Sequence, residues 1–456
     1  MHINFNILQL YNQSAPTVKA SLWFVTCSVI QKGLSFITVP VFTSIMPEEE
    51  YGYFSLFQSW LSVILIFSTL NLHYQVYNNG ALKFQEHTNE YVTSLIGLSW
   101  MASCILFSFF CLFYRMWTPV TGMPLHWMLY MFLECTMMMP YNIFLCRERM
   151  SNSYKAVVIT TLISVFSATL FGLYMVATNN GTADSRLLAI VICDTIIGIV
   201  IFFVLFPYGK TLYNKTIWKY SLRLAVPLLP HYLANVILTS LGSIMIARYC
   251  GGEKLALYTV AYSLGMIMQI VVNSVNAAIN PWIYRTMNKR NYSELKKGTS
   301  ILYVIMAVLT ILPTLVGTAY IHLFMKATYY EAESLIGVIA ASSYFTYVYS
   351  ILLVYELYFE KTRYTSIASV IAAVGNIVFN YCGIQIWGYQ AVAYVTLICY
   401  ILLALVHYYF LNKICIENQL FISRIIDIKL VTTIGIFVCI LAFVISSFVE
   451  ILNFRS

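Results

Sequence analysis

The stretch Ser28–Phe42, SVIQKGLSFITVPVF, places a lysine inside an apolar run. The apolar residues around it extend from about Ser21 to Met46, which is long enough for a helix to cross a bilayer. Lys32 lies near the middle of this run, beside Gln31. A cation at the centre of a membrane costs about 2.5–3.5 kcal/mol on insertion scales. The stretch therefore predicts a membrane-spanning helix whose charged residue needs a specific partner.

The composition of the whole chain indicates a membrane protein with many spans. Of its 456 residues, 60% are hydrophobic and only 10% are charged, and the mean hydropathy is +0.77. Soluble domains carry about 25% charged residues, so we predict an all-α polytopic membrane protein. Its polar loops are too short for a soluble catalytic domain, and we expect no cleaved signal peptide.

Few residues in the sequence suggest a cofactor. The 11 cysteines lie mostly in apolar runs and lack Cys-x-x-Cys spacing, which favours buried thiols over a metal site. The GKT at Gly209–Thr211 lacks the upstream glycine of a phosphate-binding loop, where Val204 stands instead. We therefore expect no catalytic residue, bound metal or nucleotide.

Thirteen apolar runs predict membrane-spanning helices. The predicted ranges are Ser21–Met46, Tyr53–Tyr77, Tyr91–Tyr114, Met123–Cys146, Tyr154–Ala177, Leu187–Tyr208, Leu222–Tyr249, Leu255–Trp282, Thr299–Phe324, Ser334–Phe359, Tyr364–Trp387, Tyr389–Leu411 and Ile428–Leu452. Most of the 26 Lys and Arg residues fall in alternate polar segments, beginning with the one that contains Lys19. The positive-inside rule then predicts a cytoplasmic N-terminus. A genuine thirteenth span would put the C-terminus on the other side.

Two matches within the sequence indicate an internal repeat. EEYGYFSLF from Glu49 is similar to EKLALYTVA from Glu253, 204 positions later, and SYKAVVITTLISVF from Ser153 is similar to RYTSIASVIAAVGN from Arg363, 210 positions later. Spans 1–6 and 7–12 are therefore predicted to be two copies that enter the membrane from the same side, related by a pseudo-two-fold axis along the membrane normal. The predicted divisions are an N-terminal lobe at 1–208, a cytoplasmic connector at 209–220, a C-terminal lobe at 221–411 and about one extra C-terminal helix at 412–456.

Polar side chains within these spans are the candidate site residues. They are Gln31, Lys32 and Ser35 on the first span, Glu134 on the fourth, Asp194 on the sixth, Arg223, His231, Asn235 and Arg248 on or beside the seventh, Gln269, Asn273 and Asn276 on the eighth, and Asn376 and Asn380 on the eleventh. Steps of three or four residues place several of them on one helix face. Such stripes either tie helices together or line a wet cavity.

Two of the charged candidates have specific alternatives. Lys32 would either pair with Glu134 or Asp194 inside the protein, or project into a water-filled cavity that receives an anionic head group. Arg248 would either contribute to that cavity or extend its guanidinium to the membrane surface.

Three motifs resemble those of a known family. They are QKGLSFITVPVFTSIMPEEEYGYFSLF from Gln31, PLLPHYLANVILTSLGSIMIARYCGGEKLALYTVAYSLG from Pro227, and GNIVFNYCGIQIWGYQAVAYVTLICYILL from Gly375. In order and spacing, they resemble the polysaccharide, or O-antigen, flippases of the multidrug/oligosaccharidyl-lipid/polysaccharide exporter superfamily. The resemblance extends from about Ser21 to Leu411.

The resemblance implies both a fold and a function. The implied fold is V-shaped, with two lobes around a polar cavity. The implied function is alternating-access transfer of undecaprenyl-diphosphate-linked oligosaccharides from the cytoplasmic to the periplasmic leaflet of the bacterial inner membrane, for O-antigen, lipopolysaccharide or a similar surface polysaccharide. Lys32 would attract the diphosphate, because opposite charges interact more strongly in a low-dielectric cavity than in water. An H⁺ or Na⁺ gradient is the expected drive, with Glu134 and Asp194 as titrating groups, and a polysaccharide polymerase and chain-length machinery are the expected partners.

Two other functions compete with this one. A drug or cation antiporter of the same superfamily would have acidic residues dominating its cavity, and the two carboxylates against one lysine are compatible with it. A membrane glycan polymerase or acyltransferase would be an enzyme, but the outer loops here are short, and His126 and His322 lie near span ends.

Overall fold

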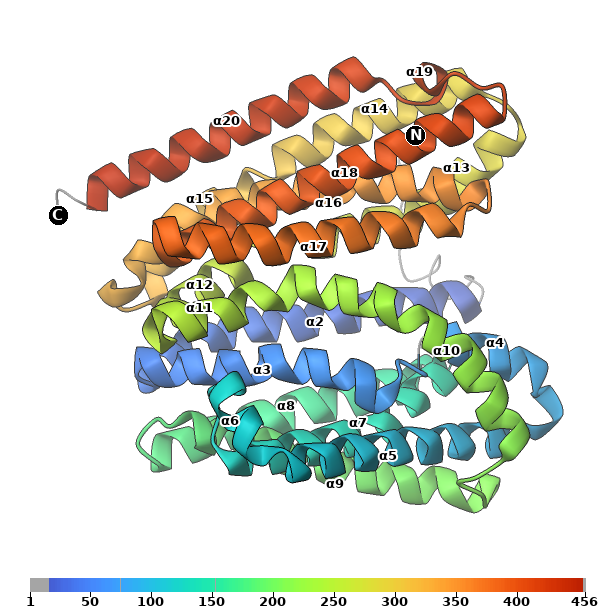
Figure 1. The fold of residues 1–456 in the computed structure, drawn as a ribbon, viewed down its shortest axis with the longest axis vertical. Helices are drawn as coiled ribbons and strands as arrows, with labels where there is room; N and C mark the ends of the chain where they lie inside the picture. The colour runs from blue at the N-terminus through green and yellow to red at the C-terminus, as the bar shows by residue number, and fades with distance from the viewer. Residues whose placement is uncertain (1–15, 74, 152, 454–456) are drawn as a thin grey trace, which may run out of the picture. The chain divides into compact units, whose positions relative to one another are not determined.

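The structure, a computed structural model, describes residues 16–73, 75–151 and 153–453 (Figure 1). Helices account for nearly all of them, and these described ranges contain no β-strand. Helices dominate because a backbone in hydrocarbon must satisfy its own hydrogen bonds. The all-α class predicted from composition is thus confirmed.

A helix, or a pair of consecutive helices, lies at each of the thirteen predicted spans. They are α2 (Pro16–Ile45), α3 (Glu48–Thr69), α5 (Thr88–Leu112), α7 (Leu125–Met150), α8 (Tyr154–Thr178), α9 (Ala183–Gly209), α10 (Lys215–Val236) with α11 (Gly242–Cys250), α12 (Gly252–Gly265) with α13 (Met268–Asn288), α14 (Tyr292–Leu309) with α15 (Leu312–Phe324), α16 (Glu333–Tyr358), α17 (Thr362–Trp387), α18 (Ala391–Glu417) and α20 (Ile428–Asn453). Eleven helical runs in the described residues are long and apolar enough to cross a membrane. The longest, Arg363–Glu417, contains both α17 and α18, and the apolar part of α2, Val29–Ile45, is shorter.

The shorter helices lie between these elements. They are α4 (Gln75–Lys83), η1 (Gln85–His87), α6 (Tyr114–Thr121), the π-helical turn η2 (Ile237–Leu241), η3 (Ala327–Ala332), η4 (Gly388–Gln390) and α19 (Ile422–Ile425). One predicted boundary is wrong: the second span was expected to reach Tyr77, but α3 ends at Thr69. The chain turns there because Leu70 and Asn71 adopt positive φ values of 50° and 46°. A left-handed pair of this kind ends a helix.

The chain divides into two compact units. The first contains residues up to Met46 together with Trp60–Leu229, and the second contains Pro47–Ser59 together with Pro230–Ser456. Helix α3 therefore begins in the second unit and continues in the first. The predicted connector, 209–220, contains the end of α9 and the first turns of α10.

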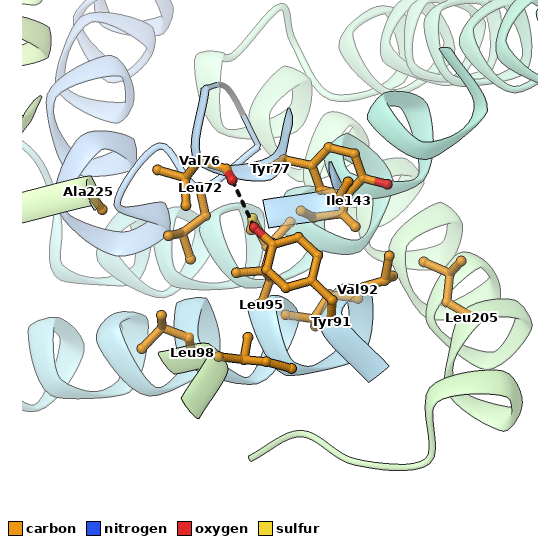
Figure 2. Packing of buried hydrophobic residues seen from close by; sticks show 14 of the residues in the cluster. Leu72, Val76, Tyr77, Tyr91, Val92, Leu95, Leu98, Ile143, Leu205 and Ala225 are labelled. Atoms are coloured by element: carbon orange, nitrogen blue, oxygen red, sulfur yellow. Dashed lines mark hydrogen bonds between the residues drawn. The ribbon is translucent and has the colours of Figure 1, made fainter. Parts of the chain in front are cut away.

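In the first unit, α9 packs against α7, α8 and α5, and α2 packs against α8. Its core includes a cluster around Tyr91, whose hydroxyl donates to the carbonyl of Val76 at 2.8 Å (Figure 2). Leu72, Leu95 and Ile143 pack around this ring. A buried tyrosine keeps its polar tip satisfied in this way while burying an apolar ring.

The turn after α3 places a histidine beside this core. The Cys146 thiol donates to the His73 carbonyl at 2.9 Å. Burial lowers the pKa of His73 from 6.5 to about 4. Between these two pH values the unfolded chain binds a proton that the folded chain does not bind, so stability falls as the pH is lowered through this range.

We predict that His73→Gln reduces the acid sensitivity of the fold. The wild-type protein should lose up to about 3 kcal/mol of stability through His73 as the pH falls from about 6.5 to about 4, and the neutral amide removes this loss. Thermal unfolding in detergent at several pH values measures it, with exposed His87→Gln as the control. Equal pH slopes for wild type and His73→Gln would contradict the assignment.

In the second unit, α16 is the central element. It packs against α18, α20, α12, α13 and α15, while α17 packs against α18. Four fully buried tyrosines, Tyr303, Tyr344, Tyr347 and Tyr355, lie on α14 and α16. Helix α20 lies along α16 and α14, so the extra C-terminal helix is an integral part of this unit (Figure 1).

The start of α3 lies very close to another backbone segment of the second unit. A Cβ added to Gly52 would overlap the backbone carbonyl of Gly252, and the Thr328 hydroxyl donates to Glu48 Oε1 at 2.6 Å. Only a residue without a side chain permits two backbones to come this close.

We predict that Gly52→Ala destabilises the protein by about 2 kcal/mol or more, because the backbones must separate to admit a methyl group. Gly33→Ala on α2 is the matched control, since a Cβ there meets nothing within 4 Å. The control should be neutral or stabilising by up to about 1 kcal/mol. Thermal unfolding compares the two variants, and unchanged stability of Gly52→Ala would show that this contact is not tight.

Candidate functional site

The predicted residues of the first span lie on α2. The Ser35 hydroxyl donates to the Gln31 carbonyl at 3.0 Å and is exposed. The side chain of Lys32 lies outside the described residues, so its partner stays a prediction.

The first unit brings Glu134 and Asp194 together. Glu134, on α7, is buried with 3% exposure, and Asp194 lies on α9, the helix packed against it. The contact between α7 and α9 brings the two side chains near each other, and the Ser164 hydroxyl of α8 donates to Asp194 Oδ1 at 3.3 Å. The second Glu134 oxygen has no hydrogen-bond partner among the described residues.

Two carboxylates have no donor between them, so a hydrogen bond between these groups requires one proton. We refer to Glu134 and Asp194 as the carboxyl pair. Their side chains can hold a proton, or give it up to a small cation that oxygen atoms coordinate. Among the described residues no Lys or Arg forms an ion pair with either of them.

In the second unit, His231 and Asn235 occupy successive turns of α10. Their side chains meet at 3.3 Å between His231 Nε2 and Asn235 Nδ2, while His231 Nδ1 is buried with no hydrogen-bond partner among the residues that the structure describes. The π-helical turn η2 follows immediately, and Thr239 within it donates to the Asn235 carbonyl at 3.1 Å. π-helical turns are frequent at functional sites because they disturb the regular helix.

The predicted polar stripe on α13 divides into two parts. Gln269 Nε2 reaches Asn273 Oδ1 at 3.5 Å, and Asn273 is exposed. Asn276 is instead tied to α16, because its amide donates to the Ser350 hydroxyl at 2.9 Å and Ser350 donates back at 3.2 Å. A reciprocal pair of this kind is a helix–helix tie.

Asn376 and Asn380 lie within the contact between α17 and α18. They are 1% and 0% exposed. Asn380 Nδ2 donates to Asn376 Oδ1 at 3.0 Å, and Asn376 Nδ2 donates to the Cys399 sulfur at 3.7 Å. The Asn376 contact with Cys399 joins α17 to α18, as expected of a tie between helices, whereas the Asn380–Asn376 bond lies within α17 and supports it. Arg223 and Arg248, by contrast, are exposed.

We predict that Asn380→Ala costs about 1–3 kcal/mol of stability, because it leaves the buried Asn376 oxygen without a donor. Exposed Asn235→Ala is the control and should change stability by less than about 0.5 kcal/mol. Thermal unfolding in detergent measures both variants. Unchanged stability of Asn380→Ala would contradict the tie and favour a binding role.

The structure also reveals an ionisable pair that the sequence reading missed. Glu356 on α16 and His407 on α18 are 0% and 1% exposed, and their Oε1 and Nδ1 atoms are 2.9 Å apart. A signal was available, since both residues lie inside predicted spans and an ionisable residue at such depth is a functional candidate by default. The residues of the described chain contain no group of three or more metal-ligating side chains.

Comparison with solved structures defines the class of protein. The fold matches a multidrug resistance transporter of the MATE family, of the MOP superfamily, with a TM-score of 0.66 and 14% identity over 86% of this chain and 97% of that one. It matches the lipid II flippase MurJ with the same TM-score and identity, over 95% of this chain and all of that one. The chain therefore has the fold of a polytopic transporter of this superfamily.

Sequence comparison then gives the family. The model of a family described as polysaccharide biosynthesis proteins matches residues 17–287. A protein of the Lsg locus of Haemophilus influenzae is 20% identical over 373 residues, which cover 78% of this chain and 88% of that protein. The chain belongs to the polysaccharide biosynthesis protein family.

Proposed function

We propose that the protein is a flippase that moves undecaprenyl-diphosphate-linked oligosaccharide repeat units, of O-antigen or a similar surface polysaccharide, from the cytoplasmic to the periplasmic leaflet. The family match over residues 17–287 carries this proposal. The fold likeness to a lipid II flippase supports it, because that protein's name identifies a lipid-linked substrate. The protein acts in the bacterial inner membrane, with a cytoplasmic N-terminus and without catalysing a covalent step.

Alternating access is the proposed mechanism. The protein exposes a polar cavity first to one leaflet and then to the other, while the polyprenyl tail stays in lipid. Lys32 neutralises the diphosphate during passage, since an unpaired anion in a low-dielectric region is costly. Polar side chains on the lobes, including Gln31, Asn235 and Asn273, donate to sugar hydroxyls.

The carboxyl pair is the proposed coupling site for an H⁺ or Na⁺ ion. Glu134 is buried, Asp194 is half-buried on the helix packed against it, and two neighbouring carboxyls can share a proton. Each unit charge that crosses the membrane supplies about 2.3 kcal/mol per 100 mV. Release of the ion from Glu134 and Asp194 would drive the return of the empty carrier.

An antiporter of drugs or cations is the second candidate function. The specific observation that favours it is the carboxyl pair itself, which presents acidic groups to a cation. The family match argues against it, and the two functions differ in cargo: a cationic dye for the antiporter, and an anionic lipid for the flippase. Polysaccharide polymerase and chain-length proteins are the proposed partners of the flippase.

We predict that Lys32→Ala abolishes transport while Lys289→Ala, an exposed control lysine, preserves it. The assay is accumulation of lipid-linked repeat units in a bacterial strain that lacks its own copy of this protein. Wild type and Lys289→Ala should clear the accumulated lipid, and Lys32→Ala should leave it at least about tenfold higher, a difference of about 1.4 kcal/mol. Full clearance by Lys32→Ala at equal protein level would remove this lysine from the mechanism.

A further inference from the structure

The pair formed by Glu356 and His407 has no role in the function proposed above. Both side chains are fully buried, and the imidazole Nδ1 lies 2.9 Å from Glu356 Oε1. The other carboxylate oxygen, Oε2, accepts a hydrogen bond from the Thr365 hydroxyl of α17 at 3.2 Å. Three neighbouring helices, α16, α17 and α18, therefore each contribute one side chain to a closed cluster.

The position of Glu356 is energetically unfavourable for a carboxylate. It lies in the last turn of α16, where the helix dipole disfavours a negative charge. Replacing a buried ion pair by apolar residues is often neutral or stabilising, so stability alone does not explain its presence. Residues that break a local rule of this kind are expected at functional sites.

The hydrogen bonds determine where a proton can bind. When Glu356 is ionised, it accepts from Thr365 through one oxygen and from His407 Nδ1–H through the other, because a carboxylate can only accept. The nitrogen left to gain or lose a proton is His407 Nε2. Binding there changes the pair from one net negative charge to none, and the surrounding helices feel that change strongly because they are buried.

The charged groups around the pair are otherwise engaged or exposed. Glu417, at the end of α18, pairs with Lys361, which precedes α17, at 3.1 Å. Lys413 of α18 lies over the Tyr364 ring of α17, 5.6 Å from the ring centroid. The Tyr349 ring of α16 stacks on the His407 imidazole at 5.7 Å between centroids. Glu360 and Arg363, beside the ends of α16 and α17, are exposed. From α10, His231 lies close enough to His407 for their charges to interact.

The first unit contains a polar cluster on the three helices that the predicted repeat matches with these, at other positions along them. The repeat that matches Ser153 with Arg363 aligns α8 with α17, so α7, α8 and α9 correspond to α16, α17 and α18. The first cluster takes Glu134 from α7, Ser164 from α8 and Asp194 from α9. In both clusters a hydroxyl of the middle helix donates to a carboxylate of a neighbour, at 3.3 Å and 3.2 Å.

We propose that Glu356, His407 and Thr365 form a proton-binding site in the second unit, with His407 Nε2 as the atom that gains and loses the proton. Its coupling to transport rests on the proposed function, whereas proton binding itself does not. Each unit then contains one protonatable cluster on the same three helices of the repeat.

Nitrogen NMR of the full chain, labelled at histidine and held in lipid bilayers, tests proton binding directly. The His407 signal is assigned by its absence in His407→Gln, and in the wild type it should show both the neutral and the charged imidazole as the pH is varied. In Glu356→Gln, the side-chain amide oxygen can still accept a hydrogen bond from His407 Nδ1–H, but the negative charge is lost. His407 should therefore stay neutral at every pH tested. The exposed Glu417→Gln on α18 is the matched control and should titrate as wild type does.

A second variant and a second measurement keep the test decisive. If Glu356→Gln does not fold, Thr365→Val removes only the hydroxyl donor and should move the titration midpoint. In vesicles containing lipid-linked oligosaccharide, Glu356→Gln should flatten the pH dependence of transport at least threefold relative to wild type and to Glu417→Gln. A His407 signal that does not titrate in the wild type, or that titrates identically in Glu356→Gln, overturns the site. Absence of any oligosaccharide transport by the wild type refutes the proposed function, while the NMR result still decides the site.

Discussion

The structure depends on one constraint: in a hydrocarbon solvent, every polar group must find its partner inside the protein. The backbone meets this constraint by forming helices, which make up nearly all of the described chain. Side chains meet it by pairing across helices, as Asn376 of α17 does with Cys399 of α18. A polar side chain that finds no such partner inside the protein is therefore a candidate for a functional role.

This constraint separates structural polar residues from functional ones. Asn376 and Asn276 reach partners on adjacent helices, and their bonds hold α17 to α18 and α13 to α16. The ionisable clusters differ, because a carboxylate in a dry interior is costly even when it is hydrogen-bonded. Binding of a coupling ion would explain the presence of such groups, whereas packing alone does not explain it. The proposed site at Glu356 and His407 would give the second unit a place for a proton, in addition to the carboxyl pair of the first unit.

Much of the fold could be predicted from the sequence, because long apolar runs and basic loops are local signals. The end of α3 could not, since it depends on the left-handed turn at Leu70 and Asn71 within an apolar stretch. The carboxyl pair was predicted only as two separate residues, because the packing of α7 against α9 brings them together. Glu356 and His407 were missed for a similar reason: they are 51 positions apart and meet only through the contact between α16 and α18. The role of Lys32 and the two-fold relation of the halves stay predictions.

The central claim is that this chain transfers a lipid-linked oligosaccharide across the bilayer. The most direct measurement uses purified protein in sealed vesicles that contain undecaprenyl-diphosphate-linked oligosaccharide, with a membrane-impermeant glycosidase added outside. Glycan from the inner leaflet should become accessible to the enzyme at least about tenfold faster than in protein-free vesicles, and an imposed ion gradient should change that rate. Equal rates with and without protein, together with gradient-driven export of a cationic dye, would contradict the account and favour the antiporter.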